Sequence, residues 1–261
     1  KKGIKTVVIQ TTHKSSGEFP EDFHAEYYYT YGDFEKTEFK NYLTDSKVEA
    51  VGSLKANIAK NYLISKKIPF QKKFDICLIS EPHLELNTDG WRNTKKAHEF
   101  IAKIADYTLM FCKKYNKKLV FSGKGDLDKS GDKYLDIIFY KNNLKEKNFK
   151  IDFGRRKEFT TYKNIAQSEL VIALNSSCLR ESFAFDKKVL CCDISESTDT
   201  KFPGSGIHIL KEDNYNDFEK RVLMLLEMSY KNYLLNIKDL KLIYNKEADT
   251  LKTLQKKLKI Q

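Results

Sequence analysis

The segment from Val171 to Asp193 combines residue types that could bind an anionic ligand. Asn175, Ser176 and Ser177 directly follow an apolar run, and the positions after them have helical character. Serine is a preferred helix N-cap, and the free amides of a first helical turn attract phosphate. Glu181 lies about one helical turn further on, where its carboxylate could accept hydrogen bonds from a sugar hydroxyl. Simple capping is the competing interpretation, because serine and glutamate at this spacing nearly form a capping box.

Polar or small residues also end most of the other apolar runs, each of which is short enough to be a strand. In an open parallel sheet, ligands bind at the carboxyl ends of the strands, so these positions are candidates for one shared site. They are Gln10, Gly52, Ser53, Ser80, Glu81, Ser122, Gly123, Lys124 and Asp193. The glycine-rich turn at Gly123 and Lys124 would let a phosphate approach the backbone, although an ordinary turn explains it equally well.

The elements that must position these residues alternate along the chain. Short apolar strands are expected at residues 3–10, 25–31, 48–51, 74–80, 118–123, 170–174, 188–193 and 207–210. Helices are expected at residues 33–43, 54–66, 94–115, 132–142, 162–167 and 177–185, and over most of the chain from residue 215 onward. This alternation predicts an α/β fold in which helices cover both faces of a parallel sheet.

A break in the pattern near residues 66–73 divides the chain into parts. Residues 1–70 are predicted to form a partial N-terminal α/β domain with its linker. Residues 71–225 are predicted to form a complete, doubly wound, Rossmann-like C-terminal domain. The helices of residues 226–261 are expected to pack back across both.

The composition favours a globular protein and excludes several functional classes. Hydrophobic residues make up 41% of the chain, and no apolar run approaches the roughly 20 residues of a transmembrane helix. The five cysteines form no CxxC pair, so buried thiols in a cytoplasmic protein are expected, and no metal site. The P-loop, GxGxxG, HExxH and GxSxG motifs are absent, which removes the usual support for kinases, dehydrogenases, zinc proteases and α/β-hydrolases.

The net charge of +11 invites a nucleic-acid interpretation, but the distribution of charge disfavours it. All but five of the 47 basic residues are lysine, and they are spread among 36 acidic residues along the whole chain. Such dispersion indicates a solvated surface without a focused groove, so no nucleic-acid partner is expected. The basic surface is compatible with peripheral contact with an anionic inner membrane.

The segment "YKNIAQSELVIALNSSCLRESFAFDKKVLCCD" resembles the nucleotide-sugar-binding half of GT-B glycosyltransferases. It is most similar to bacterial proteins of surface-carbohydrate (capsule and lipopolysaccharide) biosynthesis, which are akin to the Kdo and CDP-glycerol transferases. The matching residues are, in order, Tyr162, Ile165, Ser168, Val171, Asn175, Ser176, Ser177, Glu181, Lys188, Val189 and Leu190. The N-terminal stretches "GIKTVVIQ", "YYYTYGDFEKTEF" and "VEAVGSLK" fit the same pattern. The resemblance covers most of residues 3–195, and the order of its short motifs is its strongest support.

The resemblance implies roles for particular residues. The donor-binding residues would be Ser53, Ser80, His83, Gly123, Lys124, Thr160, Thr161, Tyr162, Asn175, Ser176, Ser177 and Glu181. Among them, Ser176 and Ser177 would hold the donor phosphate, and Glu181 would orient the donor. Thr11 and Thr12 replace the family's His-Gly pair after the first strand. His13, one position beyond the expected place, is therefore the candidate catalytic base, with an ordinary loop histidine as the alternative.

On this resemblance the protein would be a metal-independent glycosyltransferase. It would use a nucleotide sugar and a glycan or lipid-linked acceptor, with no cofactor beyond the donor. Likeness to the Kdo transferases points to a CMP-linked sugar, and CDP- and UDP-linked sugars are the alternatives. Residues 1–70 match only the last part of a GT-B N-terminal domain, which implies either a longer natural chain or a reduced chain that is not catalytic. A non-catalytic nucleotide-sugar-binding module and an epimerase of the same fold are the alternatives.

Overall fold

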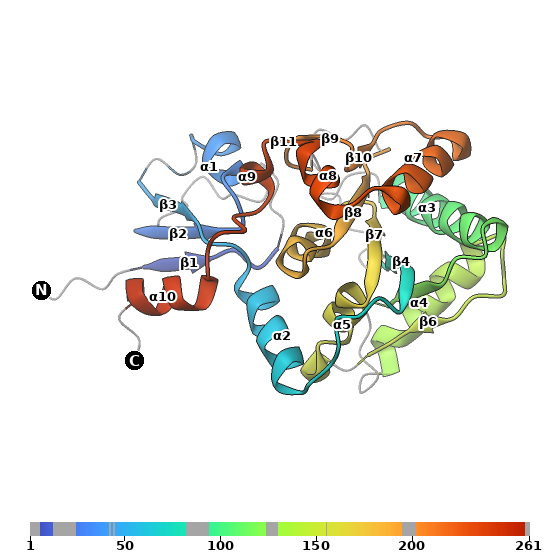
Figure 1. Cartoon of the computed structure of the whole chain (residues 1–261), viewed down its shortest axis with the longest axis horizontal. Coiled ribbons are helices and arrows are strands. Elements are labelled where there is room, and N and C mark those ends of the chain that lie inside the picture. The colour runs from blue at the N-terminus through green and yellow to red at the C-terminus, as the bar shows by residue number, and fades with distance from the viewer. Residues whose placement is uncertain are drawn as a thin grey trace, which may run out of the picture.

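The computed structural model describes residues 6–12, 25–41, 43, 45–81, 94–123, 130–154, 156–194 and 202–258. Within these residues the chain forms two parallel sheets that lie side by side, each with helices packed around it (Figure 1). The smaller sheet belongs to the N-terminal part of the chain and the larger sheet to the middle. The α/β class predicted from the alternation of strands and helices is therefore confirmed.

The larger sheet has six parallel strands in the order β10-β8-β7-β4-β5-β6. Their bounds are β4 Phe74–Ile79, β5 Leu119–Ser122, β6 Ile151–Asp152, β7 Ser168–Ala173, β8 Lys188–Cys192 and β10 Ile209–Leu210. The chain builds outward from β4 through β5 to β6, then returns to the other side of β4 to add β7, β8 and β10. This is the order of a doubly wound sheet, and it makes the β4–β7 junction a topological switch point.

The helices around this sheet connect successive strands. They are α3 Thr94–Lys114, α4 Ser130–Asn143, α5 Thr160–Ala166, α6 Ser177–Glu181 and α7 Tyr215–Glu227, with the 3-10 helices η2 Arg156–Glu158 and η3 Ser182–Phe185. Helix α3 buries Phe100, Ile101, Ile104 and Ala105, which recur at the spacing of one helical face. The amphipathic pattern predicted a helix over residues 94–115, and its end is within one residue of the observed end of α3 at Lys114.

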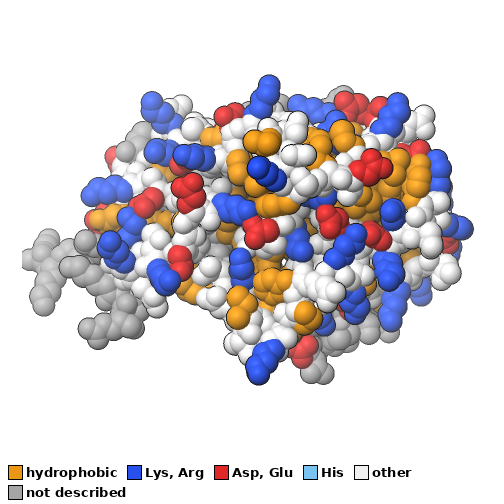
Figure 2. Space-filling view, viewed as in Figure 1, with side chains coloured by type: hydrophobic (Ala, Val, Ile, Leu, Met, Phe, Trp, Pro, Cys, Tyr) orange, Lys and Arg blue, Asp and Glu red, His pale blue; other side chains and the backbone are white. Residues whose placement is uncertain are grey.

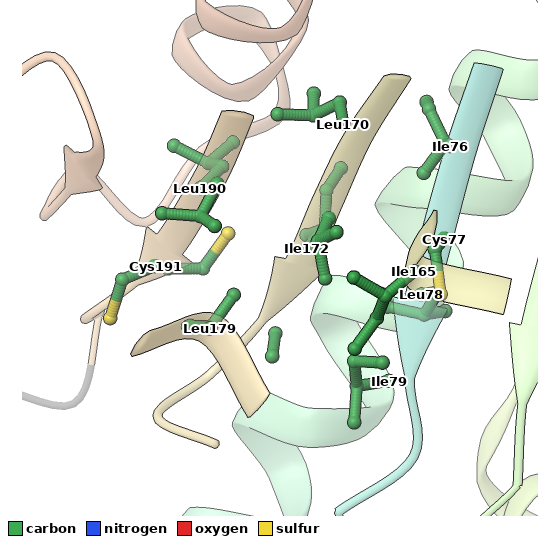
Figure 3. Close-up of a cluster of buried hydrophobic side chains, with 14 of the residues drawn as sticks. Ile76, Cys77, Leu78, Ile79, Ile165, Leu170, Ile172, Leu179, Leu190 and Cys191 are labelled. Carbon is green, nitrogen blue, oxygen red and sulfur yellow. The ribbon is translucent and has the colours of Figure 1, made fainter. Parts of the chain in front are cut away.

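The core of the molecule lies along the central strands of the larger sheet. Figure 3 shows Ile76 of β4, Leu170 and Ile172 of β7 and Leu190 of β8 gathered with Leu179 of α6, and each of these five side chains is 0% exposed. The strands are apolar at successive positions because both of their faces are covered. Complete burial of one such side chain contributes about 1.5–3 kcal/mol relative to its exposure.

The smaller sheet has three parallel strands in the order β1-β2-β3. Their bounds are β1 Val7–Ile9, β2 Tyr27–Thr30 and β3 Lys47–Ala50, and the associated helices are α1 Phe34–Glu38 and α2 Leu54–Ser65. Tyr28 and Tyr29, adjacent on β2, belong to separate hydrophobic clusters. Successive side chains of a strand point to opposite faces, so both faces of this small sheet are packed.

Three further helices follow α7, and they are α8 Tyr230–Leu235, α9 Leu240–Ile243 and α10 Thr250–Leu258. Helix α8 stays on the large sheet, where Tyr233 is bonded to Val189 of β8, and the last two helices return to the N-terminal part of the chain. Helix α9 lies against α1, and α10 lies beside the small sheet and α2 (Figure 1). Gly32 lies so close to the segment around α9 that a Cβ added to it would stand 2.4 Å from the carbonyl oxygen of Leu242. The positions of the domain boundaries stay predictions.

Two local differences from the expected elements have physical causes. Helix α1 ends at Glu38 and is much shorter than the expected helix over residues 33–43, and its N-cap Asp33 makes no capping hydrogen bond because its backbone is not extended. Strands β9 Ser205–Gly206 and β11 Ile237–Lys238 form an antiparallel pair that was not predicted. Strands of two residues carry no hydrophobic period from which they could be recognised.

Candidate ligand-binding site

The switch point of the larger sheet brings together two polar segments. Strands β4 and β7 are paired neighbours, so Ser80 and Glu81 after β4 lie beside Leu174 and Asn175 after β7. Strand β5 pairs with β4 on the other side and is followed by Gly123 at the same edge. This edge is where ligands bind in open parallel sheets.

Glu81 bridges the two strands at the switch point. Its carboxylate accepts hydrogen bonds from the backbone amides of Leu174 (2.5 Å) and Asn175 (3.0 Å). Two successive amides that point toward one carboxylate form a small anion-binding concavity. The sequence indicated only a polar strand end at Glu81, because a side chain that reaches amides so distant in the chain leaves no local signal.

Ser176 has the capping role expected of it. It is the N-cap of α6, and its Oγ accepts a hydrogen bond from the amide of Cys178 (3.3 Å). Asn175, Ser176 and Ser177 are all half-buried. Helix α6 has only five residues before it continues as the 3-10 helix η3, so few aligned peptide dipoles lie behind its first turn. The backbone amides of Leu174 and Asn175, which already hold the Glu81 carboxylate, are therefore better placed to bind an anion than the short helix α6.

Ser80 and Gly123 lie beneath this edge and have structural partners. Ser80 is 3% exposed, and its Oγ donates to the hydroxyl of Tyr140 (3.3 Å). At Gly123 an added Cβ would lie 2.5 Å from the ring of Phe153, so packing alone requires glycine there. Both residues are at the predicted edge, and both are explained without a ligand.

Two residues predicted to bind the sugar donor, Ser53 and Tyr162, contact a third, Glu181, in the interior between the two sheets. One carboxylate oxygen, Oε1, accepts hydrogen bonds from the hydroxyls of Ser53 (2.8 Å) and Tyr31 (3.1 Å). The other oxygen, Oε2, accepts one from the hydroxyl of Tyr162 (2.8 Å). Glu181 is 1% exposed and Ser53 is 0% exposed. A sugar hydroxyl could reach this carboxylate only by displacing one of these internal donors.

Burial dominates the protonation of this group. It raises the pKa of the Glu181 carboxyl above its ordinary value, against the lowering influence of Lys55 and of the three hydroxyl donors. Burial, together with the Glu181 charge, also raises the pKa of Tyr162 and Tyr31 far above the usual tyrosine value. Both phenols therefore remain protonated donors at any physiological pH.

Arg180, the neighbour of Glu181, forms a buried ion pair across the two parts of the chain. Its Nη1 is 2.6 Å from Oε1 of Glu35 and its Nη2 is 3.2 Å from Oε2, and both side chains are 0% exposed. Its Nε donates to the carbonyl of Ile243 (2.9 Å), and Gln10 donates to the same carboxylate (2.6 Å). Arg180 is therefore fully buried and has a structural partner at each of these atoms.

The Arg180 guanidinium favours the charged form of Glu35. Burial alone would raise the pKa of Glu35, but the Arg180 guanidinium and the Gln10 amide outweigh it and hold the pKa below its ordinary value. Tyr31 packs under the guanidinium, with its ring centroid 5.0 Å from Arg180 Cζ. We call Gln10, Tyr31, Glu35, Ser53, Tyr162, Arg180 and Glu181 the interlobe network. It joins the small sheet to the large one.

The remaining predicted residues lie either at the start of α5 or in segments that the structure does not describe. Thr160 and Thr161 are half-buried and open α5, after Phe159 in a left-handed conformation. Lys55 is exposed on the first turn of α2, with its Nζ 5.8 Å from the Tyr162 ring centroid. The predicted residues His13, His83 and Lys124 lie outside the described residues.

A pocket of about 240 Å³ opens further along the same edge, at the carboxyl end of β8. Its lining residues in the described part of the chain are Asp193, Phe202, Gly204, Ser205, Gly206, Ile209, Lys211 and Glu212. We call this the Asp193 pocket. The sequence indicated Asp193 as a polar strand end but gave no sign of the wall opposite, which the unpredicted strand β9 supplies.

Surface charge is dispersed over the side of the molecule shown in Figure 2. Lys and Arg side chains are scattered there with Asp and Glu between them, and they do not gather into one stripe. Among the described residues, no three His, Cys, Asp or Glu side chains are grouped so that they could hold a metal ion. None of the helices in the described ranges is both long and apolar enough to cross a membrane.

The architecture defines a class of protein. A six-stranded, doubly wound sheet and a second parallel sheet, joined by C-terminal helices that return to the first part of the chain, form a GT-B-like fold. The predicted fold class is thus confirmed. No protein-family model matches the sequence, and a search of curated proteins finds no significant match.

Similar solved structures include UDP-GlcNAc 2-epimerase from Neisseria meningitidis bound to UDP-GlcNAc, at 15% identity and a TM-score of 0.52. The likeness covers 90% of this chain and 61% of the epimerase, so this chain spans less than two thirds of that protein. A glycosyltransferase from Rickettsia africae follows at 12% identity and a TM-score of 0.41, covering 98% of this chain and 71% of that one. The H548A form of the wall teichoic acid polymerase TagF has 11% identity and a TM-score of 0.44, and the likeness covers 90% of this chain and 58% of TagF. The likeness to the epimerase supports the fold.

Proposed function

We propose that this chain carries the donor-binding part of a metal-independent glycosyltransferase. The reaction would transfer a sugar from a nucleotide-activated donor to a glycan or lipid-linked acceptor. One observation carries the proposal: two backbone amides at the switch point, those of Leu174 and Asn175, already hold an anionic group, the Glu81 carboxylate. The position is where the ligand of a doubly wound sheet lies.

The chemistry proposed for this edge is electrostatic. The donor's phosphate would replace the Glu81 carboxylate on the two amides, with the hydroxyls of Ser176 and Ser177 beside it. Donors fixed in place before the reaction stabilise the negative charge that grows on the phosphate as the glycosidic bond breaks. A general base would deprotonate the acceptor hydroxyl, and His13 is the candidate from the sequence. The nucleotide sugar is a substrate, and the proposed reaction requires no cofactor.

The biological setting is proposed from the sequence motifs. A role in bacterial surface-polysaccharide synthesis, capsule or lipopolysaccharide, is supported by the order of three motifs, which are residues 175–177, Glu181 and the strand start at residues 188–190. We place the protein in the cytoplasm, where it can contact the inner membrane peripherally. A CMP-linked donor follows from the same resemblance. The epimerase of similar fold is bound to UDP-GlcNAc, which supports a nucleotide sugar as the ligand class.

A non-catalytic binding module is the second candidate. The interlobe network favours it, because Glu181 and Arg180 are used to hold the two sheets together and are closed to substrate. Such a module would bind the nucleotide sugar for a partner that supplies the acceptor site. The two candidates differ in one assay: the transferase releases nucleotide when an acceptor is added, whereas the module binds the donor and releases none.

The ligand class can be tested by thermal unfolding with CMP, CDP, UDP and GDP. A ligand at about 100 times its Kd adds about 2.7 kcal/mol to the free energy of unfolding, which corresponds to a rise in Tm of several degrees. The informative variant is Ser176→Ala. Its matched control is Ser229→Ala, which removes the equivalent capping hydroxyl from α8. Each N-cap loss lowers the Tm without ligand by a similar amount.

We expect one nucleotide to raise the Tm of the wild type and of Ser229→Ala, and to raise that of Ser176→Ala much less. If no nucleotide raises the Tm of the wild type, the proposed ligand class is wrong. If the two alanine variants respond equally, the nucleotide binds elsewhere and the switch-point site is wrong.

A further inference from the structure

Asp193 occupies a defined place at the ligand edge of the large sheet. Strand β8 pairs with β10 so that Cys192 lies opposite Leu210, and with β7 so that Cys191 lies opposite Ala173. If the β8–β10 pairing is continued by one residue, Lys211 lies beside Asp193. If the β8–β7 pairing is continued by two residues, Asn175 lies at the level of Asp193 on its other side. Asp193 therefore lies one strand away from the proposed phosphate site.

The Asp193 carboxylate lacks the partners that a partly buried charge normally has. It is half-buried, yet within the described ranges it accepts no hydrogen bond and forms no ion pair. Burial raises its pKa, and the charge of Lys211 offsets this only in part. A half-buried carboxylate that no described protein donor reaches takes its hydrogen bonds from water or from a ligand. Here the carboxylate lines an open pocket, and a ligand with hydrogen-bond donors would satisfy it.

The chemistry of the Asp193 pocket selects among ligands. Asp193 and Glu212 are acidic and Lys211 is basic, so the three charged lining residues sum to one negative charge. A phosphate is disfavoured in such surroundings, whereas hydroxyl groups that donate to carboxylates are favoured. Phe202 and Ile209 add apolar wall of the kind on which a sugar ring can pack. The volume of about 240 Å³ lies below the roughly 300–1,000 Å³ of sites for whole drug-sized ligands, so it suits one ring of a larger molecule.

We infer that the Asp193 pocket binds the vicinal hydroxyl groups of the nucleotide sugar, with the Asp193 carboxylate as their acceptor. This inference rests on the proposed function. It gives Asp193 the role that the sequence suggested for Glu181, whose oxygens are taken by Tyr31, Ser53 and Tyr162. The hydroxyls belong either to the ribose or to the transferred sugar, because both present hydroxyl groups on neighbouring carbon atoms.

Isothermal titration of the wild type and Asp193→Asn tests the inference with defined probes. The probes are UDP and CDP, their 2′,3′-dideoxy forms, and UDP-GlcNAc. We expect Asp193→Asn to weaken the binding of the diol-bearing ligand about tenfold or more, because hydrogen bonds to a charged group are lost. The matched control is Asp213→Asn, an exposed carboxylate that pairs with Lys103 outside the pocket and whose loss should leave affinity unchanged.

The probes separate the two sources of the diol. If the ribose is bound, the dideoxy forms bind the wild type as weakly as the parent nucleotides bind Asp193→Asn, and the variant weakens them no further. If the sugar is bound, only UDP-GlcNAc is weakened by Asp193→Asn. Equal affinity of wild type and variant for every probe would overturn the inference and leave the proposed function standing. Absence of binding to the wild type would overturn both.

Discussion

Arg180 and Glu35 form an ion pair in which neither side chain is exposed. The two contacts between guanidinium and carboxylate are parallel, and the remaining groups are bonded to Gln10 and to the carbonyl of Ile243. A buried pair is not by itself a large source of stability, because desolvation offsets the attraction. Removal of one charged partner is costly, however, because the other charge then stays buried and uncompensated.

Glu35→Gln should therefore lower the free energy of unfolding at neutral pH by about 3–5 kcal/mol, measured by urea denaturation. The matched control is Glu49→Gln, which breaks a largely exposed pair with Lys257 and should cost less than about 1 kcal/mol. Because the pKa of Glu35 is held below its ordinary value of 4.5, its contribution is present above that pH. It should disappear as pH falls through the lowered pKa, so wild type and variant should converge in acid. Equal losses in the two variants at neutral pH would contradict this account.

Glu181 should show the opposite dependence on pH. Burial raises its pKa above the ordinary value of 4.5, so the folded state binds the proton more tightly than the unfolded chain does. Its contribution to stability is complete below that pH and is lost as pH rises through the raised pKa. Relative to Glu181→Gln, the wild type should become steadily less stable between acid and neutral pH, as measured by urea denaturation at a series of pH values. A wild-type advantage that grows with pH would show that the three hydroxyl donors outweigh burial.

At the scale of elements, the sequence predicted best where a hydrophobic pattern was long. Helices α2 and α3 and strands β4, β7 and β8 agree with the expected ranges within about two residues, which is the usual scatter of boundaries. Helix α1 was expected to be longer, because the residues that follow it include the buried Phe39 and Leu43 and continue an apolar pattern. The helix expected over residues 177–185 is observed as α6 followed directly by the 3-10 helix η3. Contacts between distant segments decide such ends, and a local pattern does not contain them.

The C-terminal helix α10 contributes to the core of the small sheet. Leu254 is 5% exposed and packs in one cluster with Tyr29 and Val51. Leu254→Ala should lower the free energy of unfolding by about 2–5 kcal/mol, since it removes a buried side chain and leaves a cavity. Lys256→Ala, exposed on the same helix, should change it by less than about 0.5 kcal/mol. If Leu254→Ala were as stable as Lys256→Ala in chemical denaturation, α10 would not be docked as described.

At the scale of the whole molecule, the two sheets are held as one unit by the interlobe network and by the returning C-terminal helices (Figure 1). The sequence predicted which residues end the strands and that the sheet is doubly wound. It could not show that Glu181 would be buried, because its partner Tyr31 is 150 positions away and comes from the other sheet. Nor could it show that Glu81 would reach across the switch point to the end of β7. The local sequence pattern predicted that these residues lie at the carboxyl edge of the large sheet. Their burial and their hydrogen-bond partners depend on how the two sheets pack together, which a local pattern does not contain.

The central claim is that the carboxyl edge of the large sheet binds a nucleotide sugar. The most direct test is hydrogen–deuterium exchange of the full chain, read by mass spectrometry, with and without UDP-GlcNAc or the nucleotide that gives the largest rise in Tm. We predict slower exchange in peptides that contain residues 170–177, 190–194 and 202–212, with little change in α10. Unchanged exchange in all three peptides, or protection confined to other parts of the chain, would contradict the account.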